Sequence, residues 1–384
     1  MDFELVRPTI LHSPMGSSSV DSLPLSGQGS SRADYNSSLR PSSPAFSTLS
    51  GSSAKNPGAD RPSESPDMVA HRQRELRWIS TMSAVPSAQA RKNKKIRKLI
   101  SEGVPASVRY VVWAYLTDSK AKRINGLYEK FGRRENIPAA GHIQYDVRLY
   151  SSTQPEAQED ALTNVLHAYL AMVPDVRYSK GLTFVAGQLL ALGPEEDAFW
   201  TFVSMMDSHL RPYFSSNPIQ LEVDASLFSK AVEVNDASLA KKCYVDMAIS
   251  PVAICQPWRL MPYIIRFTSV FADALPPEYL YRVWDVFLYE GVPFLFRVGL
   301  ALLQCCRRSL LECMSQDALL ALLSRPPPAC LPATPDALLD VAASVKLKDD
   351  DVRKQRSKLE AQVKRRVQAR AMANISSSIS LPRS

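Results

Sequence analysis

The chain has 384 residues, of which 45% are hydrophobic and 22% are charged, enough for one or two ordinary hydrophobic cores. Its formal net charge of +8 is unevenly distributed, because residues 146–345 carry 14 Lys and Arg against 22 Asp and Glu. A domain that binds nucleic acid would itself carry the positive charge, so the acidic central part argues against nucleic acid as a partner.

The six cysteines show neither metal-binding spacing nor a CxxC pair, so we expect reduced thiols and no metal site. The longest strongly apolar stretch, "VPFLFRVGLALLQCC" at 292–306, contains Arg297. It is also shorter than the roughly 20 residues that a membrane-spanning helix needs. We therefore expect a cytoplasmic protein that is at most peripheral to endomembranes.

The first part of the chain is rich in Ser, Pro and Gly, most clearly between residues 13 and 65. Such a composition buries too little apolar surface to offset the entropy of an ordered backbone, so we expect residues 1–88 to be disordered. A basic run, "RKNKKIRK", follows at 91–98. Runs of this kind are mostly solvated, and contact with an anionic membrane is the alternative.

From about residue 95 the apolar residues recur at helical spacing. One helix is predicted to end at Pro174, a second to begin at Pro194 with three acidic residues in its first turn, and a third to end at Gly291. A fourth is predicted over residues 294–314. Because alternating strand patterns are scarce, the sequence predicts an all-α fold.

Four segments of this helical region, in order along the chain, resemble the TBC domain family of Rab GTPase-activating proteins. They are "EGVPASVRYVVWAYL" (102–116), "DALTNVLHAYLAMVPDVRYSKGLTFVAGQLL" (160–190), "EEDAFWTFV" (195–203) and "LPPEYLYRVWDVFLYEGVPFLFRVGLALL" (275–303). The resemblance implies a TBC-type helical domain, which we place at residues 89–330. It also implies a Rab-family small GTPase as partner, a role in vesicle traffic, and no cofactor of its own, because GTP and Mg²⁺ belong to the GTPase.

In this family an arginine in a motif written I-x-x-D-x-x-R-T supplies positive charge to the hydrolysis of GTP. Ile143 and Asp146 match the motif, but Leu149 occupies the arginine position and Arg148 stands one residue early. One residue along a helix turns a side chain by about 100°, enough to aim it elsewhere. A glutamine in a second motif, Y-x-Q-G, orients the attacking water.

Tyr178 and Gly181 match this second motif, but Lys180 replaces the glutamine. Lysine has no acceptor atom with which to orient water. We interpret Arg148 and Lys180 as altered finger residues, supported by Asp146, Tyr178 and Gly181. Two hypotheses remain open: a GTPase activator in which Arg148 or Lys180 supplies the charge, and a non-catalytic Rab-binding or scaffold module that retains the fold.

Other residues of the resemblance are expected to be architectural, because a tryptophan at helical spacing usually lies in a core with a nearby arginine paired to a carboxylate. These are Arg109, Trp113, Arg282, Trp284 and Asp285. Relative to the family pattern, residues 259–266 read as an insertion, which is either a real loop between helices or an artefact of how the coding sequence was assembled. Residues 331–384 are predicted to be a linker, a basic helix and a short tail. The helix has a thin apolar stripe, so we expect it to be exposed or to seek a partner, an anionic membrane among the alternatives.

Overall fold

The computed structural model describes residues 66–132, 137, 139–215, 219–255 and 269–379. The chain divides into two units, Met1–Arg61 and Pro62–Ser384, and every helix described below belongs to the second. The Ser-rich part of the predicted disordered segment, up to residue 65, and the insertion predicted at 259–266 lie outside the described residues.

The all-α prediction is confirmed, since helices dominate the described ranges. In these ranges, β-type pairing is limited to an isolated antiparallel bridge between Val176 and Ser215. The first helices are α1 (Pro66–Ala84), α2 (Lys94–Glu102), α3 (Arg109–Leu116), α4 (Ser119–Lys122), α5 (Leu127–Gly132), α6 (Ala140–Thr153), α7 (Glu159–Met172), α8 (Lys180–Leu190), α9 (Glu195–Met205) and α10 (Arg211–Phe214). Short 3₁₀ turns lie at Ser87–Lys92 and Ala106–Val108, and a π turn, Met206–Leu210, links α9 to α10.

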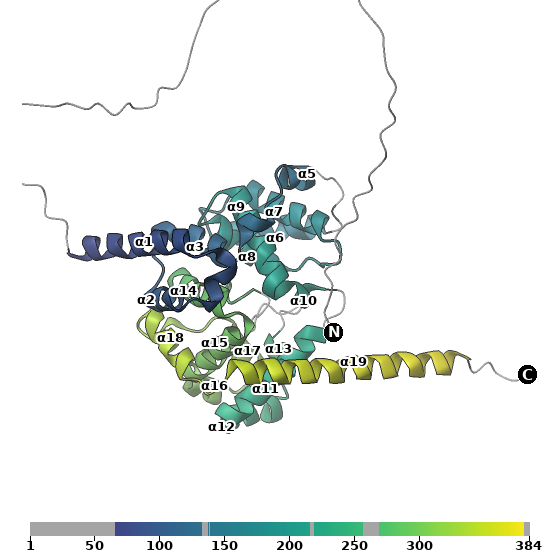
Figure 1. The fold of residues 1–384 in the computed structure, drawn as a ribbon. Coiled ribbons are helices and arrows are strands. Elements are labelled where there is room, and N and C mark those ends of the chain that lie inside the picture. The colour runs from purple at the N-terminus through teal and green to yellow at the C-terminus, as the bar shows by residue number, and fades with distance from the viewer. Residues whose placement is uncertain (1–65, 133–136, 138, 216–218, 256–268, 380–384) are drawn as a thin grey trace, which may run out of the picture. The chain divides into compact units, whose positions relative to one another are not determined.

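The second set of helices follows in chain order. It comprises α11 (Ile219–Asn235), α12 (Ala237–Ala240), α13 (Pro251–Cys255), α14 (Pro277–Glu290), α15 (Val292–Cys305), α16 (Arg307–Glu312), α17 (Gln316–Ser324), α18 (Pro335–Ser344) and α19 (Asp349–Ile379), with a π turn at Lys241–Asp246 and a 3₁₀ turn at Pro328–Cys330. Figure 1 shows α19 running beside α11 and extending past it.

The predicted helix ends agree with the structure at three places. α7 ends just before Pro174, α9 begins directly after Pro194, and Gly291 ends α14 at a φ of 85°, where glycine is favoured. The single helix predicted over 294–314 is wrong, because the chain turns at Cys306 between α15 and α16. The apolar spacing continues across that turn, so periodicity alone did not reveal it.

The core contains the two tryptophans that the sequence assigned to it. Trp113 of α3 and Trp284 of α14 are fully buried, with ring centroids 5.4 Å apart. The indole of Trp113 donates a hydrogen bond of 2.8 Å to Asp285, whose carboxylate also lies 3.3 Å from Arg109 and 3.7 Å from Arg282. The architectural role expected of these five residues is therefore borne out.

The boundary predicted at residue 88 differs from the structure, because α1 is an ordered helix over residues 66–84. Trp78 of α1 is fully buried and its indole donates to the carbonyl of Gly103 at 3.3 Å. Arg77 pairs with Glu102 of α2 at 2.8 Å. These contacts join α1 to residues 25 positions further along the chain, so the local composition of α1 does not reveal them.

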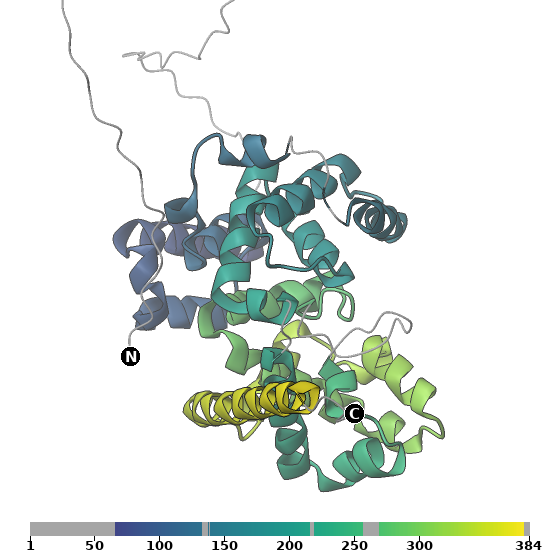
Figure 2. The same cartoon turned by 90° about the vertical axis from the view of Figure 1, so that its right-hand side faces the viewer.

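The boundary predicted at residue 330 also differs, since α18 packs on α14 and α15 and buries Leu338 and Ala342. One face of the first half of α19 is likewise packed. It lies against α11 and α15 and buries Val352 and Val363. Figure 2, turned by 90°, shows α1 and α19 well separated. In the described ranges, no helix is both long and apolar enough to cross a membrane.

Candidate functional site

The first altered motif lies on α6, which turns one face to the core. Ile143, Val147 and Tyr150 are buried at the spacing of a helical stripe. Asp146 lies at the edge of this stripe and is half-buried, whereas Arg148 and Leu149 are exposed, Leu149 by 40%. The helix thus presents Leu149 to solvent where the resemblance places an arginine.

The helical geometry separates Arg148 from Asp146. Two residues along an α-helix turn the side-chain direction by about 200°, so Arg148 points to the other side of α6 from Asp146. Residues three apart are neighbours on a helix surface, so the position beside Asp146 belongs to Leu149. Arg148 therefore cannot replace an arginine at position 149 as long as α6 keeps its regular helical geometry.

The second altered motif begins in the turn that precedes α8. The hydroxyl of Tyr178 donates a hydrogen bond to Oδ2 of Asp146 at 2.8 Å and lies 2.8 Å from Oγ1 of Thr183, which is fully buried. Burial raises the pKa of Tyr178, and the Asp146 carboxylate raises it further. The tyrosine therefore keeps its proton and acts as the donor to Asp146, which joins the two motif segments.

Lys180 is the first residue of α8, and its ammonium group lies 5.6 Å from the ring centre of Phe184, one turn further on. The Phe184 ring in turn meets Tyr150 of α6 edge-on, with centroids 5.6 Å apart. A cation at this position adds to the positive end of the helix dipole. The start of α8 is therefore electropositive where the family's glutamine would be uncharged.

A close approach of α8 to α6 fixes the spacing of the two motifs. A Cβ atom at Gly187 would lie 2.5 Å from the ring of Tyr150, so only glycine fits there. Gln188 donates to the Tyr150 hydroxyl at 3.3 Å. Beside Tyr150 a pocket of about 460 Å³ opens, lined also by Leu162 of α7 and Tyr281 of α14.

The turn that carries Tyr178 is held on its other side by α10. Asp175 accepts two hydrogen bonds from Arg211, of 3.2 and 2.8 Å, and the backbone N–H of Arg177 donates to the carbonyl of Phe214 at 2.8 Å. The bridge between Val176 and Ser215 lies between these contacts. Residues 175–180, which we call the Tyr178 segment, are thus fixed by α6 and by α10.

The structure brings some of the predicted site residues together and keeps others apart. Asp146 and Tyr178 are in contact, and Gly181 is buried in the first turn of α8. Lys180 instead lies along α8, and Arg148 points away from Asp146. The sequence reasoning missed Thr183, Phe184 and Gly187, although the helical spacing of 180, 183, 184 and 187 is a signal that they share one face of α8. In the described ranges, no group of three or more His, Cys, Asp or Glu is placed to hold a metal ion.

Comparison with known proteins identifies the family. A family model described as the Rab-GTPase-TBC domain matches residues 106–311. TBC1 domain family member 10B from Homo sapiens is 30% identical over 243 residues, covering 61% of this chain and 29% of that protein. TBC1 domain family member 10A from Mus musculus is 31% identical over 258 residues, covering 64% and 49%. The chain thus spans less than half the length of these curated relatives.

Solved structures show the same fold. The crystal structure of the Chlamydomonas flagellar RabGAP TBC domain matches with a TM-score of 0.55 and 22% identity, covering 71% of this chain and 92% of that one. The Ypt/Rab-GAP domain of Gyp1p matches with a TM-score of 0.53 and 14% identity, covering 71% and 97%. At these identities the likeness concerns the fold alone. Because the family model spans more than half of the residues, this chain belongs to the Rab-GTPase-TBC domain family.

Proposed function

We propose that this TBC domain binds a GTP-loaded Rab-family GTPase through α6 and the start of α8, and that it accelerates GTP hydrolysis only weakly. The observation that carries the proposal is the exposed Leu149 beside Asp146, where the family places its arginine. GTP and Mg²⁺ are brought by the GTPase, so the domain needs no cofactor of its own.

The magnitude of the arginine effect supports weak activation. An arginine supplied to a GTPase contributes about 10³ to 10⁵ in rate, because it neutralises charge that builds on the phosphoryl oxygens. Leucine supplies no charge, and Arg148 lies on another side of α6. Groups that bind the GTPase and groups that act only in the transition state are separable, so we expect binding to be retained while most of the acceleration is lost.

A second candidate function is a working GTPase activator that uses Lys180 in place of the arginine. The observation that favours it is the position of Lys180 at the positive end of α8, where its charge and the helix dipole act together on an anion. An ammonium group meets phosphate as a point charge and lacks the two-point geometry of a guanidinium. We therefore rank this candidate second.

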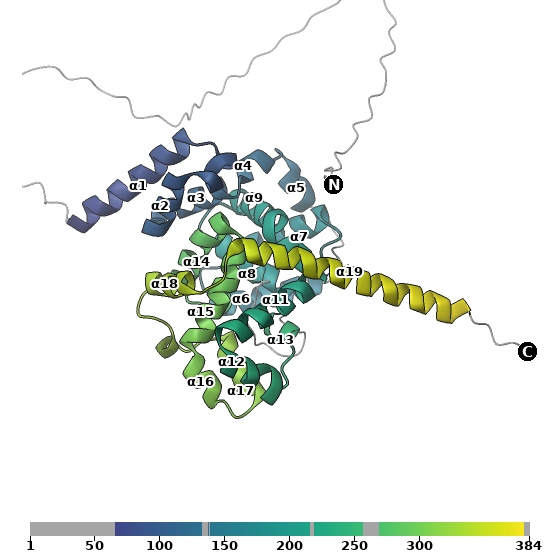
Figure 3. The same ribbon diagram turned by 60° about the horizontal axis from the view of Figure 1, so that its bottom comes forward.

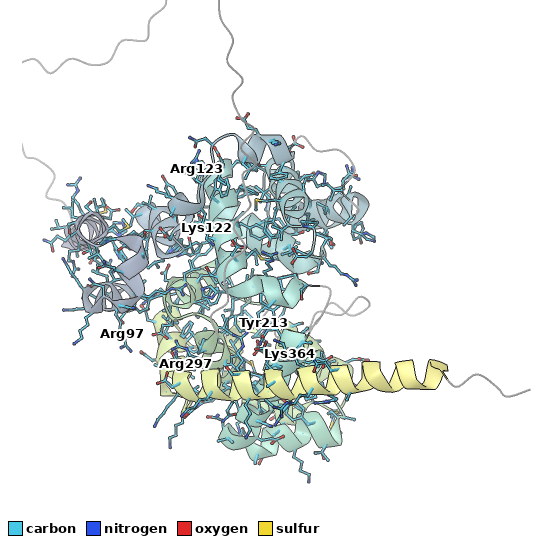
Figure 4. All side chains as sticks on the ribbon, turned by 45° about the vertical axis from the view of Figure 1, so that its right-hand side comes forward. Arg97, Lys122, Arg123, Tyr213, Arg297 and Lys364 are labelled. Carbon is cyan, nitrogen blue, oxygen red and sulfur yellow. The ribbon has the colours of Figure 1, made fainter. Side chains whose placement is uncertain are left out.

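We also propose that the protein acts in the cytoplasm at the surface of endomembranes, where Rab-family GTPases direct vesicle traffic. Exposed basic side chains support contact with anionic lipid, because such charges are attracted to the cytoplasmic leaflet. They lie on α2 (Lys94, Lys95, Arg97 and Lys98) and on α19 (Arg353, Lys354, Lys358, Lys364, Arg365 and Arg366). Figure 4 labels Arg97 and Lys364, one from each helix.

Two assays on one panel of GTP-loaded Rabs test the proposal. Binding of the full chain is measured for each Rab, together with the rate of phosphate release with and without the chain. The expected result is binding to at least one GTP-loaded Rab, with phosphate release close to the intrinsic rate. Strong stimulation that is lost in Lys180→Ala favours the second candidate. Absence of binding to every member of a complete panel overturns both.

A further inference from the structure

We infer that Arg356 of α19 is a positioning residue for the candidate site, holding the Tyr178 segment in place through Asp224 and α10. The inference deepens the proposed function, since it assigns the C-terminal helix a part in shaping the Rab-binding face. It depends on a continuous set of side-chain and backbone contacts that runs from α19 to Asp146.

The first step joins α19 to α11. Arg356 donates two hydrogen bonds of 2.8 Å to the two carboxylate oxygens of Asp224, a side chain that is fully buried. Val352, Leu359 and Val363 lie on the same face of α19 and pack inward. Because two-point pairing of a guanidinium with a carboxylate fixes both position and orientation, Arg356 sets the register of α19 on α11.

The second step joins this pair to α10. The hydroxyl of Tyr213 donates a hydrogen bond of 2.6 Å to Asp224 and accepts one of 3.3 Å from Arg356. Gln220 adds a hydrogen bond of 3.2 Å to the same carboxylate. Figure 4 shows Tyr213 close beside α19. The four side chains form one cluster, which we call the Asp224 cluster, and it holds α10 by Tyr213.

The third step joins α10 to the candidate site. Residues 211–215 hold the Tyr178 segment by the Arg211–Asp175 pair and by the hydrogen bond of 2.8 Å from the N–H of Arg177 to the carbonyl of Phe214, the residue after Tyr213. The next residue, Tyr178, donates to Asp146 on α6. A displacement of Tyr213 therefore also displaces its neighbour Phe214, whose carbonyl holds the Arg177 amide of the Tyr178 segment.

Through this set of contacts, a ligand that binds the exposed part of α19 can affect the Tyr178 segment. α19 extends past α11 in the views of Figures 1 and 3, and three exposed basic side chains, Lys364, Arg365 and Arg366, follow Val363. A ligand that pulls on the part of α19 after Val363 is opposed by the contacts of Val352, Arg356, Leu359 and Val363, and by the ion pair of Asp349 with Arg297. Since Arg356 belongs to the same cluster as Tyr213, loosening α19 loosens the segment that carries Tyr178 and Lys180.

Hydrogen exchange of the full chain without any GTPase tests the inference. Arg356→Gln is compared with Lys358→Gln, which removes one charge from an exposed position of the same helix. Arg356→Gln is expected to speed exchange of the Arg177 amide by at least about tenfold, since hydrogen bonds to charged groups are among the stronger ones. The amide of Ala198, which bonds Pro194 in α9, serves as the internal reference and should not change. Lys358→Gln should leave both amides unchanged.

The opposite result is equally specific. If exchange rises throughout α19 and α11 while the Arg177 amide keeps its protection, α19 is merely docked and the inference is overturned. If Arg356→Gln raises exchange at Ala198 as well, Tyr213→Phe decides, because it removes the hydroxyl that links α10 to Asp224 without leaving a carboxylate unpaired. It should speed exchange at Arg177 and not at Ala198, and an unchanged Arg177 amide overturns the inference.

Rab binding provides the readout that a purely structural role would not change. Among Rabs that bind the parent, Arg356→Gln should weaken binding and Lys358→Gln should not, at a temperature where both variants are folded. Unchanged affinity in Arg356→Gln overturns the part of the inference that concerns the Rab-binding face. If the parent binds no Rab, the proposed function fails, while the exchange result still decides whether Arg356 positions the Tyr178 segment.

Discussion

Tyr178 and Asp146 are joined by a hydrogen bond of 2.8 Å, which links the turn before α8 to the exposed side of α6. The Oδ2 atom of Asp146 accepts this bond from a tyrosine of the other motif. The two segments are thus held together by a side-chain contact. This contact fixes the relative position of the two segments through which we propose that the domain binds its GTPase.

Removing the Tyr178 hydroxyl should loosen this link. Tyr178→Phe keeps the ring but leaves Asp146 and Thr183 without their shared partner, so we expect it to lower the free energy of unfolding by about 1 kcal/mol. Urea denaturation measures the change. Asp146→Asn is the matched control, since its amide oxygen still accepts from Tyr178 and should cost less. A Phe variant as stable as the parent contradicts a role for this hydrogen bond.

Two tryptophans should dominate the stability of their helices. Trp284 is fully buried and donates to the carbonyl of Val270 at 2.8 Å, and Trp200 is 3% exposed. Replacing either by alanine leaves a cavity, so each should lower the free energy of unfolding by about 3 to 5 kcal/mol. Tyr145→Ala, at a position 69% exposed, is the control and should change it by less than about 0.5 kcal/mol. Equal melting of a tryptophan variant and the parent would show that the helix concerned is not anchored there.

The buried carboxylate of Asp285 should make stability depend on pH. Burial raises its pKa to about 6 from an ordinary value of 3.8, although Arg109, Trp113 and Arg282 act in the opposite direction. Between these two pH values the unfolded chain releases the proton while the folded chain keeps it. The contribution of Asp285 to folding is therefore full below about pH 4 and is lost as the pH rises towards 6.

Asp285→Asn isolates this contribution, because an amide does not titrate. Urea denaturation from pH 4 to pH 7 measures the free energy of unfolding of both proteins. The parent should lose stability relative to the variant as the pH rises to about 6, and the difference should then level off. A difference that stays constant across this range would show that the carboxylate has the same pKa in both states.

Helices were well predicted wherever local chemistry determined them, as at Pro194 and Gly291, whose effects depend on the backbone nearby. α1 was missed because Trp78 and Arg77 make their contacts with residues 25 positions away, which local composition does not show. The packing of α19 was missed for a similar reason. Its apolar stripe is thin, and Arg356 on the packed face interrupts it. The sequence does not show that Arg356 is paired with Asp224, which lies 132 residues earlier.

The sequence did not predict how the residues of the candidate site are arranged. The motifs located Asp146 and Tyr178, and the structure adds their mutual hydrogen bond. No local pattern predicts the contact of Lys180 with Phe184 or the support of the Tyr178 segment by α10, because both depend on how helices pack. The short distance between α6 and α8 depends on Gly187 opposite Tyr150, a pairing that one sequence does not reveal.

Replacing Arg148 should have almost no effect on Rab binding or on phosphate release. Arg148 is exposed on α6 and points away from Asp146, so Arg148→Ala should change neither the affinity for a GTP-loaded Rab nor the rate of phosphate release by more than about twofold. Both assays are run beside the parent at the same salt concentration, because removing an exposed charge alters long-range attraction. A large loss of stimulation in this variant would show that the shifted arginine has taken the catalytic role.

Restoring the two family residues should recover activity. An arginine at position 149 lies three residues after Asp146 and therefore beside its carboxylate, which supplies the orientation that Arg148 lacks. Lys180→Gln provides an acceptor for the attacking water and removes a cation from the start of α8. We expect Leu149→Arg with Lys180→Gln to raise phosphate release from the GTP-loaded Rab by at least about tenfold over the parent.

The single variants separate the two contributions. Leu149→Arg alone should raise the rate of phosphate release more than Lys180→Gln alone, because charge neutralisation contributes more to the acceleration than orientation of the water. Each single variant should raise the rate less than the pair, because both groups act on one transition state. Leu149→Lys is the matched control: it adds a charge without the two-point geometry of a guanidinium and should recover less. If the double variant binds the Rab as the parent does but stays at the intrinsic rate, the loss of activity does not lie in these two residues.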